Sequence, residues 1–249
     1  MSGETIAVIV IIGTITAVIA IFIIIAAKRR RAWQTLAMKL GFTLTEDDDS
    51  LQKDFKFALL SFGLAPRSAV MLSGTAQGCN VFIGDHAFET ESSESTTTHK
   101  RTFCVVQQPG LTSTNVMIWP ESHFTGFAGK LASTLGLREG LDINFDEDSE
   151  FSKAYVVRGD DETSIRSLFD QDLRRYFISH RNQLKACIIE MHQDALAIMP
   201  VDPRAAAGIG LIRPDGKEHP PCETAKRIAP EKTPELMEIG IALIRTIKF

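Results

Sequence analysis

The sequence has almost no charge in its first part, and it carries no local motif of a common catalytic site. Glu4 is the only charged residue before Lys28, so all 27 lysines and arginines lie in the rest of the chain. The patterns GxSxG, GxxxxGK[ST], HExxH and GxGxxG are absent. These absences remove the sequence signatures of α/β-hydrolases, P-loop NTPases, zincins and dinucleotide-binding enzymes. They do not exclude catalysis by residues that are distant in sequence.

Closely spaced cysteines are also missing. The four cysteines are far apart and none forms a CxxC pair, so neither a zinc site nor a disulfide framework is indicated. We expect reduced, buried thiols at Cys79, Cys104, Cys187 and Cys222. No metal and no other cofactor is predicted.

The residues between Thr5 and Ala27 form an uninterrupted apolar segment of 23 residues without charge. A bilayer core needs about 20 apolar residues in a helix, so this segment is long enough to span with some tilt. A cleaved signal peptide is the alternative. It would have positive charge before a shorter apolar core, whereas here four cations follow a long one. The sequence therefore predicts a retained transmembrane anchor over residues 1–27.

The four cations Lys28, Arg29, Arg30 and Arg31 directly follow the anchor, and Trp33 comes shortly after. Cations of this kind stay on the cytoplasmic side, and tryptophan favours the membrane–water interface. These five residues are therefore the predicted membrane interface. The predicted location is the plasma membrane of a bacterium, with the N-terminus outside and the remaining chain in the cytoplasm.

The rest of the chain is mildly acidic, with 27 basic against 30 acidic residues after Ala27. A nucleic-acid partner is not expected for such a balance. The lipid bilayer is one predicted partner. A membrane protein or a second copy is the other, because Gly13, Ala17 and Ala20 are small residues that let transmembrane helices approach closely.

The chain after the anchor divides by composition into four parts. Residues 28–42 form a basic, amphipathic helix whose apolar positions are Trp33, Leu36, Ala37 and Leu40. Residues 43–199 form a cytosolic α+β domain of mainly antiparallel strands packed with two or three helices. Residues 200–233 are proline-rich and extended, and residues 234–249 form a helix that packs on the domain.

Short β-branched and aromatic runs predict the strands of the domain. Hairpins are expected around Gly78 and around residues 192–194. One helix is predicted after Asp160 or Asp161, either of which is a suitable N-cap, because apolar residues recur at helical spacing from Ile165 to Phe177.

An acidic stretch, GLDINFDEDSE, resembles the start of a calcium loop because acidic or amide residues alternate from Asp142 to Glu150. An EF-hand needs glycine at position 6 and glutamate at position 12, and neither possible register provides them. Alternation also describes a strand with one face in water. We expect a strand, an acidic turn at residues 146–148, and a second short strand, AYVVRG.

Histidines in the β-rich half are a further candidate site. His86, His99 and His123 could converge with Cys79 or Cys104, but their spacing matches no zinc template. A pair of Asp85 with His86 is not favoured, because adjacent strand residues point to opposite faces. A metal-dependent enzyme using Asp142, Asp146, Asp148 and the histidines is therefore the weakest functional hypothesis, and no catalytic residue is assigned.

The segments INFD, EFSKAYVVRGDDE and IRSLF, between Leu141 and Phe169, resemble a pattern in uncharacterised bacterial single-pass membrane proteins. That group also has a W..LA..LGF helix, represented here by Trp33 and the residues up to Phe42. The resemblance extends from Ala32 to about Met199. It implies an N-terminal anchor with a small cytosolic α+β domain, and it brings no activity and no catalytic residues.

These observations favour a non-enzymatic interaction domain on a single-pass anchor, such as an accessory or scaffold subunit of a membrane complex. The alternative is a domain that senses a ligand or anionic lipid, with the basic segment holding it at the leaflet.

Overall fold

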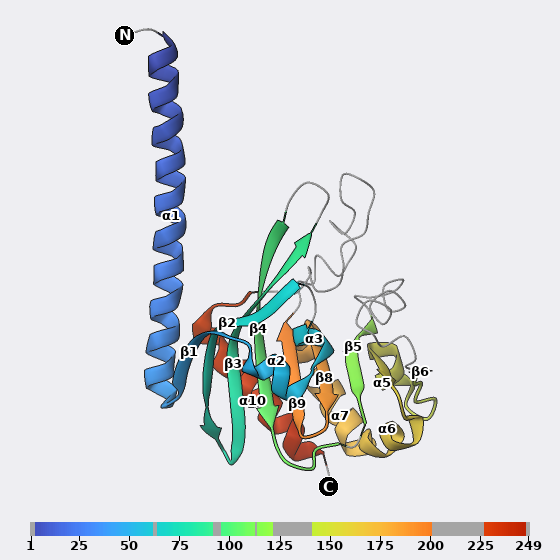
Figure 1. Ribbon diagram of the computed structural model, residues 1–249. Helices are drawn as coiled ribbons and strands as arrows, with labels where there is room; N and C mark the ends of the chain where they lie inside the picture. Colours follow the sequence, from blue (N-terminus) through green and yellow to red (C-terminus); the bar gives the residue numbers. More distant parts are fainter. Residues whose placement is uncertain are drawn as a thin grey trace.

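The computed structural model describes residues 3–61, 64–91, 96–112, 114–121, 141–200 and 227–247. Within these ranges a single long helix, α1 (Gly3–Leu40), leads into a sheet flanked by shorter helices. In Figure 1 the N-terminal half of α1 projects well away from the sheet. The predicted α+β class is confirmed, with more short helices than the two or three expected.

The sheet has nine strands in the order β1-β2-β3-β4-β9-β8-β5-β7-β6, and every neighbouring pair is antiparallel. The strands are β1 (Thr43–Asp48), β2 (Leu64–Ala76), β3 (Cys79–Glu91), β4 (Thr96–Gln107), β5 (Val116–Pro120), β6 (Leu141–Asp142), β7 (Tyr155–Gly159), β8 (Cys187–His192) and β9 (Ala195–Pro200).

Both predicted hairpins are present. Gln77 and Gly78 connect β2 to β3 with φ angles of 51° and 87°. Two successive residues with positive φ match the twist of the strands in a tight hairpin, and glycine adopts this conformation without strain. The β8–β9 turn likewise contains Gln193 with φ 51°.

One face of the sheet carries the main core, which we define as the apolar cluster covered by the C-terminal third of α1 and by α10 (Thr233–Thr246). Trp33, Leu36 and Ala37 of α1 are buried in it. The helix α10 packs on β3, β4, β9 and α7. At Gly240 it approaches β4 so closely that an added Cβ would lie 2.7 Å from a Val106 methyl carbon.

The other face of the sheet carries a second apolar core. It is covered by α2 (Ser50–Phe55) and α3 (Ala58–Ser61), which contribute Leu51, Leu59 and Leu60. The strands β5, β8 and β9 are buried on both faces, and their sequences are accordingly almost entirely apolar rather than alternating.

The helix predicted at residues 28–42 is present up to Leu40. It continues the helix of the apolar segment, since α1 runs from Gly3 to Leu40. By length and composition, one helix among the described residues, over Ile9–Leu40, could cross a membrane. The chain contains no break between the predicted anchor and the domain.

The single helix predicted after Asp160 is instead three short helices: α6 (Glu162–Leu168), α7 (Gln171–Ser179) and α8 (Arg181–Leu184). Asp161 caps α6, as one of the two expected residues, but Asp170 caps α7. An N-cap residue has non-helical backbone angles, so Asp170 begins a new helix. The apolar spacing continues across the break because all three helices face the same core.

The acidic stretch also differs from its prediction. The first strand is short, because β6 ends at Asp142, and residues 146–147 form a turn. Asp148 then accepts a hydrogen bond from the Phe151 amide and caps a helix, α5 (Ser149–Ala154). The second strand, β7, is present as predicted.

The proline-rich segment lies mostly outside the described residues. Its described part contains the 3₁₀ helix η3 (Pro230–Lys232), which leads directly into α10 and contacts α1.

Candidate functional site at the junction of the anchor helix and the sheet

The junction between α1 and the sheet is built around one buried carboxylate, Asp85 of β3. This side chain has no exposed surface. It is on the main-core face because it alternates with Val81 and Ile83, which belong to that core. A buried carboxylate is costly unless charged and hydrogen-bonding partners surround it, so its partners define the site.

Arg29 of α1 binds Asp85 with two parallel hydrogen bonds. Its Nε donates to Oδ2 at 2.7 Å and its Nη2 donates to Oδ1 at 2.6 Å. This bidentate geometry is the strongest arrangement for an arginine–carboxylate pair. The same Nη2 also donates to the Ile228 carbonyl at 2.8 Å, so one guanidinium connects α1 to β3 and to the chain before α10.

Three further side chains complete the site. Trp33 Nε1 donates to Asp85 at 3.2 Å, and Thr102 Oγ1 of β4 donates at 3.2 Å. Arg227 donates to the same carboxylate through Nε at 3.1 Å and Nη2 at 2.9 Å. The carboxylate therefore joins α1, two strands and the segment leading to η3. We call Asp85, Arg29, Trp33, Thr102 and Arg227 the junction cluster.

The charges in the junction cluster keep Asp85 ionised. Burial by itself raises the pKa of this carboxyl, but the hydrogen bonds and positive charges of Arg29 and Arg227 outweigh it, and the pKa lies below the ordinary value. The arrangement is suited to holding elements together rather than to proton transfer.

A second buried carboxylate, Glu190 of β8, lies on the opposite face of the sheet. It accepts hydrogen bonds from the amides of Ala58 and Leu59, each at 2.8 Å, and so holds α3 against the sheet. Burial raises the pKa of Glu190 to about 7, although these two bonds and the charge of Arg101 act in the opposite direction.

This raised pKa predicts a pH dependence of stability. The folded-state pKa of Glu190 lies above its unfolded value. Its contribution to stability is therefore present in full below about pH 4.5 and is lost as the pH rises through about 7. We expect the Glu190 contribution to the unfolding free energy to fall by on the order of 2–3 kcal/mol across this interval. Denaturant unfolding of the wild type and of Glu190→Gln at several pH values measures it. If the unfolding free energy fell equally steeply with pH in both proteins, the pH dependence would come from groups other than Glu190.

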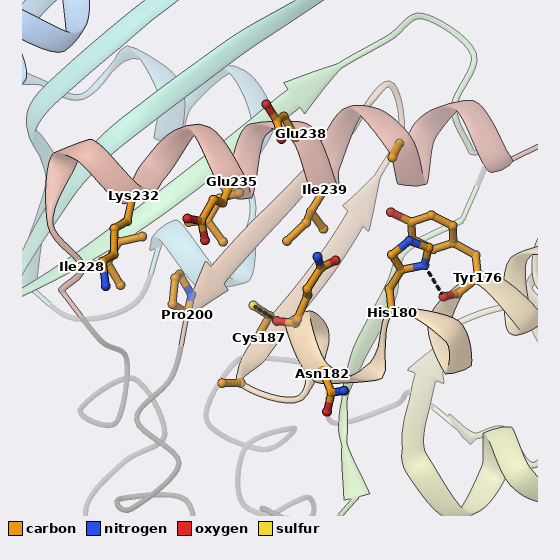
Figure 2. Close-up of a pocket in the computed structure, with 14 residues that line it drawn as sticks. Tyr176, His180, Asn182, Cys187, Pro200, Ile228, Lys232, Glu235, Glu238 and Ile239 are labelled. Carbon is orange, nitrogen blue, oxygen red and sulfur yellow. Dashed lines mark hydrogen bonds between the residues drawn. The ribbon is translucent and has the colours of Figure 1, made fainter.

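A cleft of about 620 Å³ opens between α10 on one side and α7, α8 and the start of β8 on the other. Figure 2 shows Tyr176 and His180 at one end and Ile228 and Lys232 at the other. This volume is within the range of cavities that bind small organic molecules. Burial raises the pKa of the Cys187 thiol to about 12, so the cysteine in this cleft is not an activated nucleophile.

The predicted membrane-interface residues fall into two groups. Lys28, Arg30 and Arg31 are exposed, and Arg30 pairs with Glu46 at 2.7 Å. Arg29 and Trp33 instead point into the domain, where both bind Asp85 and Trp33 has no exposed surface. The physical reason is that the buried carboxylate of Asp85 needs charged and hydrogen-bonding partners, which both side chains provide.

The predicted helix-packing residues Gly13, Ala17 and Ala20 are all exposed on α1, and an added Cβ at Gly13 would meet no atom within 4 Å. Their surface is open along the helix. Contact with another helix through these residues stays a prediction.

The residues of the metal hypothesis do not converge. Asp142 pairs with Arg158 at 2.7 Å, Asp148 caps α5 and pairs with Arg174 at 3.1 Å, and Asp146 lies in an exposed turn. Among the residues that the structure describes, no three His, Cys, Asp or Glu side chains are placed to hold a metal ion. His123 and Cys222 lie outside the described residues.

His86 and His99 have structural partners. His86 is buried beside Gln52 Nε2 at 3.0 Å, and its pKa is lowered to about 2 by burial and by the charges of Arg101 and Arg67. His99 stacks on Phe88 with ring centroids 4.9 Å apart. His86 is therefore neutral at ordinary pH.

The sequence does not predict the junction cluster. Its local pattern relates Asp85 only to His86, and it places Arg29 and Trp33 at the membrane interface. The available signal was the position of Asp85 within the apolar run VFIGDHAF, because an acid in a buried strand needs a cationic partner. The partner Arg227, 142 positions away, could not be identified from local sequence.

No protein family and no curated protein matches the chain. Among solved structures, the chain is similar to the mycobacterial trehalose monomycolate transport factor A, TtfA, with 14% sequence identity. The alignment covers 88% of this chain and 90% of that chain, with a TM-score of 0.48. A likeness at this level assigns neither a family nor a function.

Proposed function

We propose that the chain is a membrane-anchored interaction domain that serves as an accessory or scaffold subunit of a membrane protein complex. The observation that carries this proposal is the continuity of α1 with the domain. The apolar part of α1 is exposed, and the same helix is fixed to the sheet by the junction cluster. A domain attached in this way has a defined orientation relative to its anchor, which a flexible linker would not provide.

In this proposal α1 crosses the bacterial plasma membrane once, with its N-terminus outside. Lys28, Arg30 and Arg31 are exposed directly after the apolar segment, which favours a cytoplasmic domain by the positive-inside rule. The exposed apolar surface of α1, including Gly13 and Ala17, is the proposed contact with a partner helix.

The test is purification of the full-length protein from its native membrane in mild detergent, followed by mass spectrometry of the copurifying proteins. We expect an integral-membrane protein in stoichiometric amount. The test variant is Gly13→Ile, which replaces a small residue of the proposed contact by a bulky one and leaves the domain unchanged. We expect less of the partner protein to copurify with this variant than with the wild type. A strictly monomeric wild-type protein without any stable partner would contradict the proposal.

Ligand sensing is the second candidate, and the cleft beside α10 is the observation in its favour. A small molecule bound there would raise the Tm of the full-length protein by stabilising the folded state. Ala242→Trp, which fills the cleft from α10, is expected to abolish that rise.

A further inference from the structure

Two ion pairs show which residues of α1 lie beside which row of residues in the sheet. Arg29 binds Asp85 of β3, and the neighbouring Arg30 binds Glu46 of β1. Glu46 is paired with Val70, and Val70 is paired with Asp85, so both acids belong to one row across the strands. This row of the sheet therefore lies beside residues 29–30 of the helix.

A third contact gives the direction of α1 along the strands. The ring of Phe42, just after α1, lies against Gly74, where a Cβ would be 2.2 Å from a ring carbon. Gly74 is four residues beyond Val70 on β2. From Arg30 to Phe42, the contacts of this part of the chain therefore move from the row of Val70 to Gly74 on β2. Figure 1 shows the same arrangement, with β1 and β2 beside the lower part of α1.

Toward the N-terminus of α1, the strands continue beyond the row that contains Asp85 and extend toward the predicted bilayer. The β3–β4 pairing extends from Asp85 to Glu91, which pairs with Thr96. Six residues of strand advance about 20 Å. The apolar segment ends at Ala27, which is only about 3 Å beyond Arg29 at the rise of a helix. In Figure 1 the free ends of β3 and β4 lean away from α1 and reach about the level of its middle, beyond the part of the helix that packs on the sheet.

The chemistry of this end of the sheet suits lipid headgroups and not hydrocarbon. Thr96, Thr98 and Lys100 of β4 are exposed, and Leu64 at the start of β2 is 50% exposed. We call these four residues the sheet end. Charged side chains nearby, such as the Glu89 carboxylate, would be costly within the bilayer core. Hydroxyl and ammonium groups can bind phosphate and ester oxygens at the interface.

We propose that the sheet end rests on the lipid headgroups of the leaflet on the domain side, and that α1 crosses the bilayer tilted as a result. The tilt keeps the sheet end out of the hydrocarbon. It is compatible with the apolar segment, because 23 residues exceed the roughly 20 that a perpendicular helix needs. The contact follows from the fixed junction and not from charge, so it does not require anionic lipid. This inference rests on the proposed transmembrane anchor.

The test is fluorescence quenching in nanodiscs of phosphatidylcholine that contain a lipid with a nitroxide on its headgroup. The full-length protein carries Cys222→Ser, because Cys79, Cys104 and Cys187 are buried and poorly accessible to a label. One fluorophore is attached at Thr98→Cys, at the sheet end. The matched control is Thr75→Cys, another exposed strand threonine at the opposite end of β2. A third label at Phe22→Cys, tested with an acyl-chain nitroxide, reports on the anchor itself.

We expect the label at residue 98 to be quenched several-fold more than the label at residue 75, and the label at residue 22 to be quenched by the acyl-chain nitroxide. Equal quenching at residues 98 and 75, with residue 22 quenched, would overturn the headgroup contact and leave the anchor intact. An unquenched label at residue 22 would overturn the anchor, and the contact with it. Quenching at residue 98 only after anionic lipid is added would also overturn the proposal, because attraction by charge would then replace the fixed geometry.

Discussion

Asp85→Asn is expected to lower the free energy of unfolding by about 3 kcal/mol, because it removes the charge that compensates two arginines at the junction. The asparagine side chain has nearly the same shape as aspartate, but its NH2 group cannot accept a hydrogen bond from an arginine. Arg29, whose side chain is only 15% exposed, then lies in the domain without its carboxylate partner. Chemical denaturation of the full-length protein in detergent, followed by tryptophan fluorescence, measures the loss.

The matched control for Asp85→Asn is Glu46→Gln. It removes the carboxylate that binds the next residue of the same helix, Arg30, in the same row of the sheet. This pair is largely exposed, and such pairs contribute at most about 1 kcal/mol. If the two substitutions had equal effects, burial of the junction cluster would not be the source of its stability.

Trp33→Ala is expected to destabilise the domain by about 3–5 kcal/mol, as other large-to-small substitutions of buried tryptophan do. The ring has no exposed surface and packs in the main core, and its Nε1 donates to Asp85. Thermal unfolding of the full-length protein, followed by circular dichroism, measures the effect on the domain.

Met38→Ala on the same helix is the control for Trp33→Ala. Its side chain is 77% exposed, so the change is expected to remain within about 0.5 kcal/mol of the wild type. The predicted membrane role of Trp33 leads to a different result. If the ring served mainly at the lipid interface, its loss would weaken membrane attachment and leave the unfolding temperature unchanged.

Periodicity in the sequence was sufficient to predict much of the fold. The apolar segment, both tight hairpins and the strand AYVVRG depend on local signals, namely uncharged length, turn residues and alternation. Asp170 shows where such signals are insufficient. It can serve as a polar surface residue of one helix or as the N-cap of the next, and only the packing of α6 and α7 on the core decides between the two.

The junction cluster was beyond prediction for a related reason. Arg29 and Trp33 have two favourable environments, the membrane interface and a buried carboxylate, and their own sequence context fits both. Asp85 decides between them, but its pairing depends on the position of β3 beneath α1, and on Arg227 near the far end of the chain. These are tertiary contacts between segments that no local pattern relates.

We infer that α1 and the domain form one rigid body, because the junction cluster joins the helix to the sheet. The most direct test is a distance measurement by electron paramagnetic resonance between spin labels at Ala27→Cys, at the end of the apolar segment, and Thr75→Cys, on β2. Full-length protein in nanodiscs with Cys222→Ser is the suitable sample. We predict a single narrow distance distribution, which broadens when Asp85→Asn is added. A broad distribution in the protein without Asp85→Asn would contradict the claim, because the domain would then move freely relative to its anchor.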